Sequence, residues 1–474
     1  MSRRTSSIIA RRLLGALAVA VVLAIAASPA LAGWSAPLAV SRSTTGFFDV
    51  ALAKDARGEA AVAWGSERNV GRVQTRATVN VAFVAGGGRL LERALWHGAD
   101  ALVGGVAVAL DARGELTVAW VEAARGRHGE TLYPHTIRAA YRSPSGRWSP
   151  SRVVGYSGPF LEAHVRLAAA PNREVLMTWV AHTKNAPGVG AAWRKPGHPF
   201  GSTSAVSRAK SAMMIDPTPL FDSSGAAHVY GTVGCSRIHT CATMVSTAQR
   251  GHRFDAPLLI APAPAEYPVV SFSRPGRALI AWEAGDYQGL EPFGAPPHAR
   301  VMSGGSLGPP VTLQPNSGAV PGPLDAVAAN GGGGTVSWPE APPYTAPPPY
   351  QNQARTMVAV GDAHGSFSQP SVSPVGLTPA LRDGAGNMLL TPGPTNPFAP
   401  LAGKPTGPAG TAPSPVAVQP ARGGALQPSP IPLPSAAMKP WVSIAGIATT
   451  EPLGTGAAVT WVAGTKLDVS SWRP

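Results

Sequence analysis

The amino-acid sequence predicts an all-β fold in which one four-stranded antiparallel unit recurs along the chain, and three observations support this. The string Asp55-Ala-Arg-Gly-Glu-Ala-Ala-Val-Ala-Trp64 returns as Asp111-Ala-Arg-Gly-Glu-Leu-Thr-Val-Ala-Trp120 and then in looser copies. Glycine (54) and proline (50) are abundant, as expected for many short strands joined by turns. A hydrophobic content of 44% with 12 tryptophans indicates a folded chain with a large core and not a disordered one.

The N-terminal residues 1–32 are predicted to be a signal peptide. A basic segment with two Arg-Arg pairs precedes the small, apolar residues 13–27, and Ser28-Pro-Ala-Leu-Ala32 supplies the small residues of a cleavage site. The apolar run is shorter than the roughly 20 residues of a membrane-spanning helix. We therefore expect a secreted, extracytoplasmic chain that begins at Gly33 and has no stable membrane anchor. Export by the Sec or by the twin-arginine route stays open, and an uncleaved N-terminal anchor is the alternative.

The repeated unit begins with a strand, a short turn and a second strand that ends on a large side chain. These second-strand residues are Trp64, Trp120, Trp179, Tyr230, Trp282, Trp338, Leu390 and Trp461. Each turn offers residues such as Asp, Asn or Gly that tolerate the left-handed backbone of a hairpin. A second marker, Gly146-Arg-Trp-Ser-Pro150 with weaker copies, lies in the other half of the unit. Its proline is typical of an outer edge strand, because proline cannot donate to the sheet's hydrogen-bond ladder.

Four short strands repeating about every 50 residues are the signature of a β-propeller blade. The repeats predict a single propeller over residues 33–474 with eight blades, or seven if the unit around Leu390 does not close. The second-strand tryptophans are expected to fill the space between neighbouring blades. The N-terminal strand, 33–41, is expected to complete the last blade and so to close the ring. We interpret the Pro/Gly-rich residues 391–414 as an insertion loop within the seventh blade.

The two cysteines, Cys235 and Cys241, are predicted to form a local disulfide that closes a hairpin loop in the exported protein. His239 lies between them and suggests a metal as the alternative. Two thiols and one histidine without a second cluster make a poor zinc site, however. We expect no metal and no cofactor.

Two groups of candidate ligand-binding residues are predicted on the face that carries the long loops between the second and third strands. Tyr287 and Tyr344 lie in such loops, where binding residues tend to gather. The early positions of the innermost strands carry Asp49, Glu162, His164, Asp216, Glu266 and Asp325, near the mouth of the central channel. Clustered carboxylates there could bind a cation, hold sugar hydroxyls or supply an acid and a base for glycoside cleavage. Alternatively, they only keep a water-filled mouth solvated.

Three more glutamates, Glu122, Glu283 and Glu340, follow second-strand tryptophans closely and are further candidates. The distances along the sequence between the candidate carboxylates and these tryptophans are not constant, which weakens the prediction of a ring of carboxylates. Motifs for nucleophilic catalysis or phosphate binding are absent from the sequence. We assign no catalytic residue.

The repeat Asp-x-x-Gly-x-x-x-Val-Ala-Trp, with the following Gly-x-Trp-Ser-x-Pro, resembles repeats of bacterial secreted β-propeller proteins. These proteins are loosely grouped with the sialidase-like, BNR-like propellers, and the resemblance implies their architecture over nearly the whole mature chain. The sialidase Asp-box reads Ser-x-Asp-x-Gly-x-x-Trp, whereas Gly58 precedes Trp64 by six positions. The arginine triad and the tyrosine–glutamate pair of those enzymes are not identified. The resemblance therefore carries over no catalytic residue.

The formal net charge of +14, to which the signal contributes four arginines, favours loose association with anionic envelope polymers. Runs of Lys and Arg interleaved with aromatics are absent, so we expect no nucleic-acid partner. The sequence predicts a monomeric, exported, non-enzymatic propeller that binds a glycan, an envelope polymer or a protein through its long-loop face. The alternative is a sialidase-like or other glycoside-acting enzyme that uses carboxylates at the channel mouth.

Overall fold

The computed structural model of the chain describes most residues between Gly33 and Arg473. The described residues are 33–34, 38–42, 48–55, 57, 59–69, 75–84, 90–99, 101–124, 126, 131–132, 134–157, 165–182, 187–207, 215–233, 241–248, 253–263, 265–274, 276–283, 296–313, 320–321, 324–329, 332–341, 355–372, 377–382, 388–392, 417–419, 427–428, 442–449, 457–463 and 466–473. The predicted signal peptide, 1–32, and most of the predicted insertion loop, 391–414, lie outside them. Within these residues no helix is long and apolar enough to cross a membrane.

All regular secondary structure among the described residues consists of β-strands, which confirms the all-β prediction. The first strands are β1 (Gly33–Trp34), β2 (Leu38–Arg42), β3 (Phe48–Lys54), β4 (Ala60–Asn69), β5 (Thr75–Val84), β6 (Leu90–Ala99), β7 (Ala101–Leu110), β8 (Leu116–Ala124), β9 (His135–Arg142), β10 (Arg152–Ser157), β11 (Arg166–Ala169), β12 (Val175–His182), β13 (Pro187–Arg194), β14 (Ser204–Ser207), β15 (Ile215–Phe221), β16 (Ala227–Val233) and β17 (Ala242–Ala248). The others are β18 (Leu258–Ala261), β19 (Glu266–Arg274), β20 (Arg277–Glu283), β21 (Pro297–Ser303), β22 (Ser306–Leu307), β23 (Val311–Thr312), β24 (Val320–Pro321), β25 (Asp325–Ala328), β26 (Gly334–Ala341), β27 (Arg355–Gly361), β28 (Ser371–Val372), β29 (Leu377–Arg382), β30 (Met388–Pro392), β31 (Ala417–Gln419), β32 (Gln427–Pro428), β33 (Val442–Thr449), β34 (Ala457–Ala463) and β35 (Lys466–Arg473).

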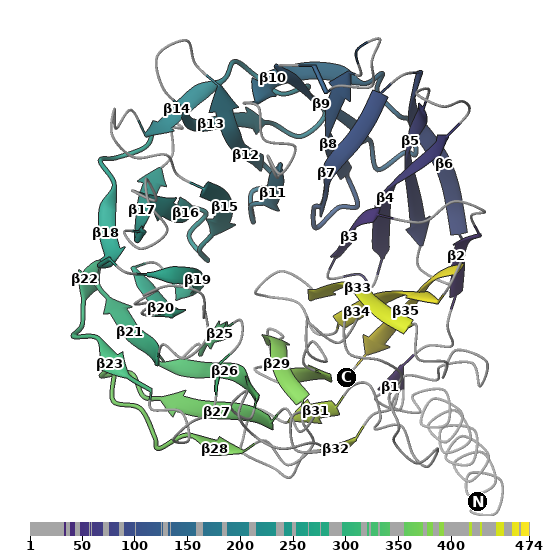
Figure 1. Cartoon of the computed structure of the whole chain (residues 1–474). Coiled ribbons are helices and arrows are strands. Elements are labelled where there is room, and N and C mark those ends of the chain that lie inside the picture. Colours follow the sequence, from purple (N-terminus) through teal and green to yellow (C-terminus); the bar gives the residue numbers. More distant parts are fainter. Residues whose placement is uncertain are drawn as a thin grey trace, which may run out of the picture.

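The strands form antiparallel meanders that lie around a common centre, the arrangement of a β-propeller (Figure 1). A typical meander is β3-β4-β5-β6, with its first strand nearest the centre and its last on the outside (Figure 1). The meanders β7–β10 and β11–β14 share one sheet, because Ser157 of β10 pairs with Ala181 of β12. At the chain's two ends, β1 and β2 both pair with β35.

The core lies between adjacent sheets, and the second-strand tryptophans fill it as predicted. Trp120 packs in a cluster with Val79, Val81 and Phe83 of the preceding meander, and Trp179 packs with residues of β8 and β9. The five such tryptophans whose side chains are described are at most 2% exposed: Trp64, Trp120, Trp179, Trp282 and Trp338. Each sheet thus covers the apolar face of its neighbour. This mutual burial is why the units need one another to fold.

Aspartates fix the turns between the first and second strands. Oδ1 of Asp111 accepts hydrogen bonds from the backbone N–H groups of Arg113 (2.8 Å) and Glu115 (2.9 Å). Asp55 and Asp222 accept the equivalent pairs in their own turns. Aspartate commonly stabilises a turn by accepting hydrogen bonds from backbone N–H groups of the same turn, whatever the function of the protein. The repeated Asp of the motif is therefore a turn residue.

One turn departs from the prediction that left-handed positions fall on Gly, Asn or Asp. In Pro171-Asn-Arg-Glu174 the positive φ of 72° belongs to Arg173. A non-glycine residue in this conformation is strained. Arg173 is held there by two ion pairs to the preceding meander, from Nε to Asp111 (2.8 Å) and from an Nη to Glu115 (3.2 Å).

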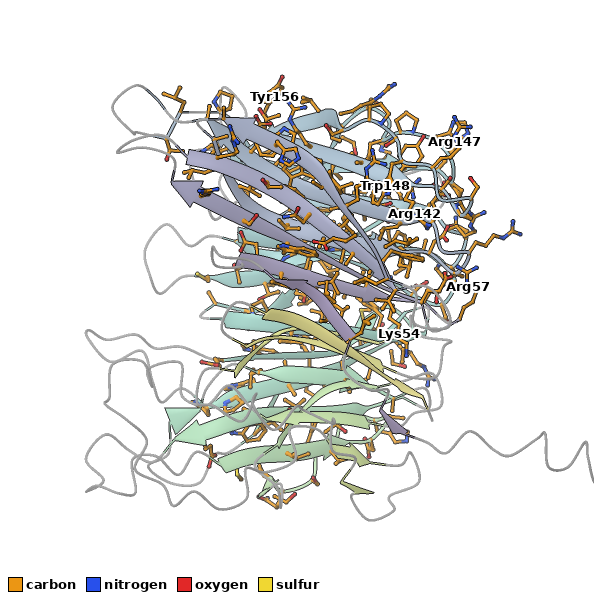
Figure 2. All side chains as sticks on the ribbon, turned by 90° about the vertical axis from the view of Figure 1, so that its right-hand side faces the viewer. Lys54, Arg57, Arg142, Arg147, Trp148 and Tyr156 are labelled. Atoms are coloured by element: carbon orange, nitrogen blue, oxygen red, sulfur yellow. The ribbon has the colours of Figure 1, made fainter. Side chains whose placement is uncertain are left out.

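Glu115 also anchors a second arginine between the two meanders. Arg194, at the end of β13, is fully buried and pairs with Glu115. Its Nε donates to Thr117 Oγ1 (3.0 Å), and its guanidinium lies 5.0 Å from the ring centroid of Tyr141. One meander earlier, Arg142 lies over Phe83 at 4.4 Å in the same way. Figure 2 shows Arg57, Arg142, Arg147 and Trp148 gathered at this end of the strands, which we call the turn end.

Candidate functional site

The opposite end of the sheets, where the innermost strands begin, is called the mouth end, and several predicted site residues lie there. Asp49 is the second residue of β3 and Asp216 the second of β15, while Glu266 and Asp325 open β19 and β25. The sequence placed these carboxylates at the beginnings of inner strands, and the strand bounds agree. Of the four, only Asp49 has a described side chain. Glu162, His164, Tyr287 and Tyr344 lie outside the described residues.

Asp49 adopts a strained backbone within a β-bulge. The pairing of β3 with β4 shifts between Phe48 and Ala51, and Asp49 has a φ of 48°. Its side chain is exposed and its Oδ2 accepts a hydrogen bond from the backbone N–H of Gly105 (3.0 Å) in the neighbouring inner strand β7. Holding a non-glycine residue in this region costs about 1–3 kcal/mol, and such residues cluster at functional sites.

Bulges recur at the mouth end of other inner strands. The register shifts between Gly104 and Ala107 in β7, between Ile215 and Thr218 in β15, and between Glu266 and Val269 in β19. Asp216 lies within its bulge and Glu266 forms the edge of another. A bulge redirects the side chains next to it and is common beside active sites. Three candidate carboxylates, Asp49, Asp216 and Glu266, therefore share one kind of backbone position.

Two of the candidate glutamates are directly opposite each other. Glu266 of β19 and Glu283 of β20 are register partners in an antiparallel pair. The side chains of such partners point to the same side of the sheet, with Cβ atoms about 4.5–5.5 Å apart. Glu283 is only 7% exposed. The sheet therefore places these two backbone positions opposite each other at the mouth end, and the side chain of Glu283 is buried.

The remaining glutamates at this end have structural partners. Glu122 forms an ion pair with Arg138 of the adjacent strand. Glu340 is buried and accepts a hydrogen bond from Nε1 of Trp338 (3.3 Å). Glu67, which the sequence analysis did not single out, accepts from the backbone N–H of Val103 (3.0 Å) in the next meander. These carboxylates stabilise strand ends.

A further polar cluster, at the turn end, escaped the sequence analysis. Asp222 Oδ2 lies 3.2 Å from His228 Nε2, and His228 Nδ1 lies 3.0 Å from Thr247 Oγ1. Burial alone would raise the pKa of Asp222, but hydrogen bonds from His228 and Ser224 outweigh it and lower that pKa. The imidazole stacks on Phe272 of the next meander at 3.9 Å. The cluster joins two sheets in a buried position, and we assign it a structural role.

Metal ligation has no support in the part of the chain that the structure describes, where no group of three or more His, Cys, Asp or Glu side chains could hold an ion. Cys241 directly precedes β17, and no described cysteine is a free thiol. Cys235 lies outside the described residues, so the disulfide between the two stays a prediction.

The comparisons with known proteins yield structural likeness alone. No family model and no curated protein matches the sequence. A polysaccharide lyase described as an ulvan lyase has a TM-score of 0.47 and 8% identity, over 78% of this chain and 93% of that one. The α-L-arabinofuranosidase of Fusarium graminearum has a TM-score of 0.39 and 11% identity over the same shares. A Hadza microbial sialidase has a TM-score of 0.35 and 10% identity, over 63% of this chain and 66% of that one. These likenesses agree with the loose resemblance to sialidase-type propellers that the repeats indicate, and they identify no substrate for this chain.

Proposed function

We propose that this chain is a glycoside-acting propeller whose carboxylates at the mouth end attack a glycan. This function is the alternative that the sequence left open, and not its main prediction. The observation that carries this proposal is the register pairing of Glu266 with Glu283. The loop tyrosines on which the binding hypothesis depended, Tyr287 and Tyr344, gain no comparable support.

The chemistry follows from placing two carboxyl groups side by side. Two carboxylates that face each other at this register would repel, and one group would then stay protonated at a pH where the other is charged. Burial disfavours a charge on Glu283, which suits it to protonate the leaving oxygen of a glycoside. Glu266 would then act as the nucleophile or base. Two carboxyl groups about 5–5.5 Å apart are the arrangement of retaining glycosidases.

Asp49 is assigned a supporting role at the same mouth. Its strained backbone and exposed side chain suit it to hold sugar hydroxyls, while one of its oxygens is already used by Gly105. Asp216 and Asp325 lie at the starts of other inner strands, and we include them as candidates to contact the same ligand.

A panel of chromogenic glycosides, together with a glycan array, tests the proposal. We expect hydrolysis of at least one glycoside, and a loss of about 10²–10⁴-fold in kcat for Glu283→Gln and for Glu266→Gln. Glu122→Gln is the matched control, since it removes a mouth-end carboxylate that is paired with Arg138. Equal losses in all three variants would refute the assigned roles.

The binding hypothesis predicts a different result from the same experiment. No glycoside would be hydrolysed, and Tyr287→Ala or Tyr344→Ala would weaken retention on a polysaccharide. If no glycoside is hydrolysed and no glycan on the array is bound, a protein partner or a structural role remains.

We also propose that the ring has eight blades and is closed by the N-terminal strand. The pairing of β1 and β2 with β35 supports closure, because it gives the last meander its outer strand from the other end of the chain. Deleting residues 33–41 should lower the melting temperature sharply, as it removes this pairing. An unchanged melting temperature would contradict closure.

From the sequence we also propose that the chain is exported and that Cys235 and Cys241 form a disulfide. The mature protein in the medium or periplasm should begin at Gly33, as read by mass spectrometry of its N-terminal peptide. A peptide linking Cys235 to Cys241 should be found in the same non-reduced digest. Recovery of an intact residue 1–32 segment, or of two alkylated cysteines, would contradict the respective proposal.

A further inference from the structure

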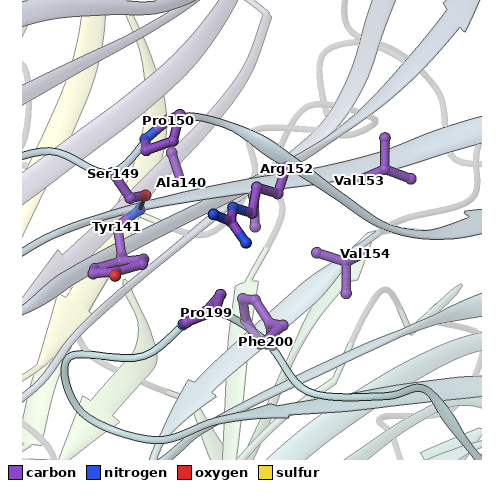
Figure 3. Close-up of a pocket in the computed structure, with 10 residues that line it drawn as sticks. Ala140, Tyr141, Ser149, Pro150, Arg152, Val153, Val154, Pro199 and Phe200 are labelled. Carbon is purple, nitrogen blue, oxygen red and sulfur yellow. Dashed lines mark hydrogen bonds between the residues drawn. The ribbon is translucent and has the colours of Figure 1, made fainter.

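A cavity of about 170 Å³ lies between two neighbouring meanders, away from the mouth end (Figure 3). One wall is formed by β9 and β10, through Ala139, Tyr141, Arg152 and Val154. The other is formed by Phe200 in the connection from β13 to β14. The cavity is separate from the carboxylates of the proposed function and does not depend on them.

The cavity lies where two meanders meet. The equivalent space between the neighbouring pairs of meanders is filled by aromatic side chains. Tyr141 occupies the register position of Phe83 in the preceding meander and of Trp193 in the following one, since each pairs with the residue three before a second-strand tryptophan. Trp148 packs against the cluster that contains Phe83, and Phe254 lies 6.2 Å from Trp193, ring centroid to ring centroid.

Tyr141 cannot fill the corresponding space below Phe200. Its hydroxyl donates to the carbonyl of Gly197 (3.2 Å), and its ring lies under the guanidinium of Arg194. These contacts hold the ring towards the turn end. Ala139 corresponds in register to Val81 of the preceding meander, since each pairs with the residue directly before a second-strand tryptophan. Alanine has two methyl groups fewer than valine, which leaves further space.

Arg152 supplies an available cation at this cavity. Figure 3 shows its side chain projecting over the opening between Tyr141 and Phe200. Among the described residues it has no hydrogen-bond or ion-pair partner. Ser149 Oγ, also at the cavity, accepts from the backbone N–H of Tyr141 (3.0 Å), so its hydroxyl proton remains to be donated. A guanidinium binds a carboxylate through its N–H donors, and the Ser149 hydroxyl is a further donor on the lining of the cavity.

The walls are fixed before any ligand arrives. β9 pairs with β10 from His135 to Ala139, with a register shift between Val153 and Gly155, and the bridge between Arg194 and Phe200 holds the opposite wall. An apolar cavity of about 150 Å³ is enough to bind benzene. A cavity of this size, with one cation at its rim, therefore suits a six-membered ring that carries a carboxylate.

We propose that this cavity binds a small organic monocarboxylate with an apolar body, its carboxylate on Arg152 and its body against Phe200 and Val154. Benzoate is the probe, and benzyl alcohol is the uncharged probe of matched shape. In calorimetric titrations of the full chain at constant ionic strength, benzoate should bind at least about tenfold more tightly than benzyl alcohol.

The decisive variant is Arg152→Met, which keeps an unbranched, flexible side chain and removes its charge. It should weaken benzoate binding about tenfold or more and leave benzyl alcohol binding unchanged. Arg147→Met is the matched control, because Arg147 is an exposed arginine close in sequence that does not line the cavity. The proposal is overturned if benzoate does not bind, or if Arg152→Met binds benzoate as tightly as the unmodified chain, or if both variants weaken it equally. The melting temperature of each variant shows that it is folded.

Discussion

Replacing Arg194 by methionine should destabilise the protein by about 3 kcal/mol. Arg194 and Glu115 are an ion pair whose side chains are 0% and 2% exposed. Removing one partner of a buried pair leaves an uncompensated charge and costs about 3–5 kcal/mol. Glu115 would keep Arg173 (3.2 Å) and the N–H of Gly197 (2.9 Å), which places the loss at the lower end of that range.

The corresponding shift in melting temperature is small because the chain is long. At about 2.1 cal/mol/K per residue, the roughly 440 residues after the predicted signal unfold with an entropy near 0.9 kcal/mol/K. A loss of 3 kcal/mol therefore lowers the melting temperature by only about 3 °C. Urea unfolding at constant temperature is the more sensitive assay.

A double-mutant cycle separates the ion pair from other effects of the substitution. Glu115→Gln alone should also destabilise, since it leaves Arg194 buried with fewer acceptors. The double variant should lose less than the sum of the two single losses, by about 0.5–3 kcal/mol. Additive losses, or a loss below about 1 kcal/mol for Arg194→Met, would refute the view that this pair joins the two meanders.

Three further predictions concern the core and the pH dependence of stability. Trp120→Ala should cost about 3–5 kcal/mol in urea unfolding, and the half-buried Trp148→Ala clearly less; equal losses would contradict the interblade role of Trp120. Because the pKa of Asp222 is lowered from 3.8, its charge stabilises the fold above that pH, and this contribution is lost as pH falls through the lower folded value. In Asp222→Asn, the free energy of unfolding should therefore fall less steeply as the pH drops below 3.8. An unchanged pH dependence would contradict this. Burial lowers the pKa of His135 from 6.5, so stability should also fall as pH drops below 6.5, and His135→Gln should remove that slope.

The strands, turns and interblade tryptophans were predictable from the sequence because each depends on a local pattern. Asp111 holds its own turn, and Trp120 follows at a fixed distance along one strand. Arg173 was not predictable in the same way. Its left-handed backbone accompanies ion pairs to Asp111 and Glu115, which lie about 60 positions earlier in the chain. No local pattern encodes such a contact.

The pairing of Glu266 with Glu283 was missed for a related reason. Both residues were candidates, but their spacing from the second-strand tryptophans follows no constant rule. The bulge between Glu266 and Val269 inserts an extra residue between the strand's start and its regular pairing, and other inner strands carry their own bulges. Counting along the sequence therefore hides positions that the sheet brings together.

The single pairing of Ser157 with Ala181 joins two meanders, and Nε1 of Trp179 adds a hydrogen bond to the carbonyl of Tyr156 (3.1 Å). The cavity that contains Arg152 is built from these same two meanders. A ligand held there would bind only while both are folded, so its binding free energy would add to the cost of opening either one. Occupancy of this site would thereby slow hydrogen exchange in β7 to β14 together.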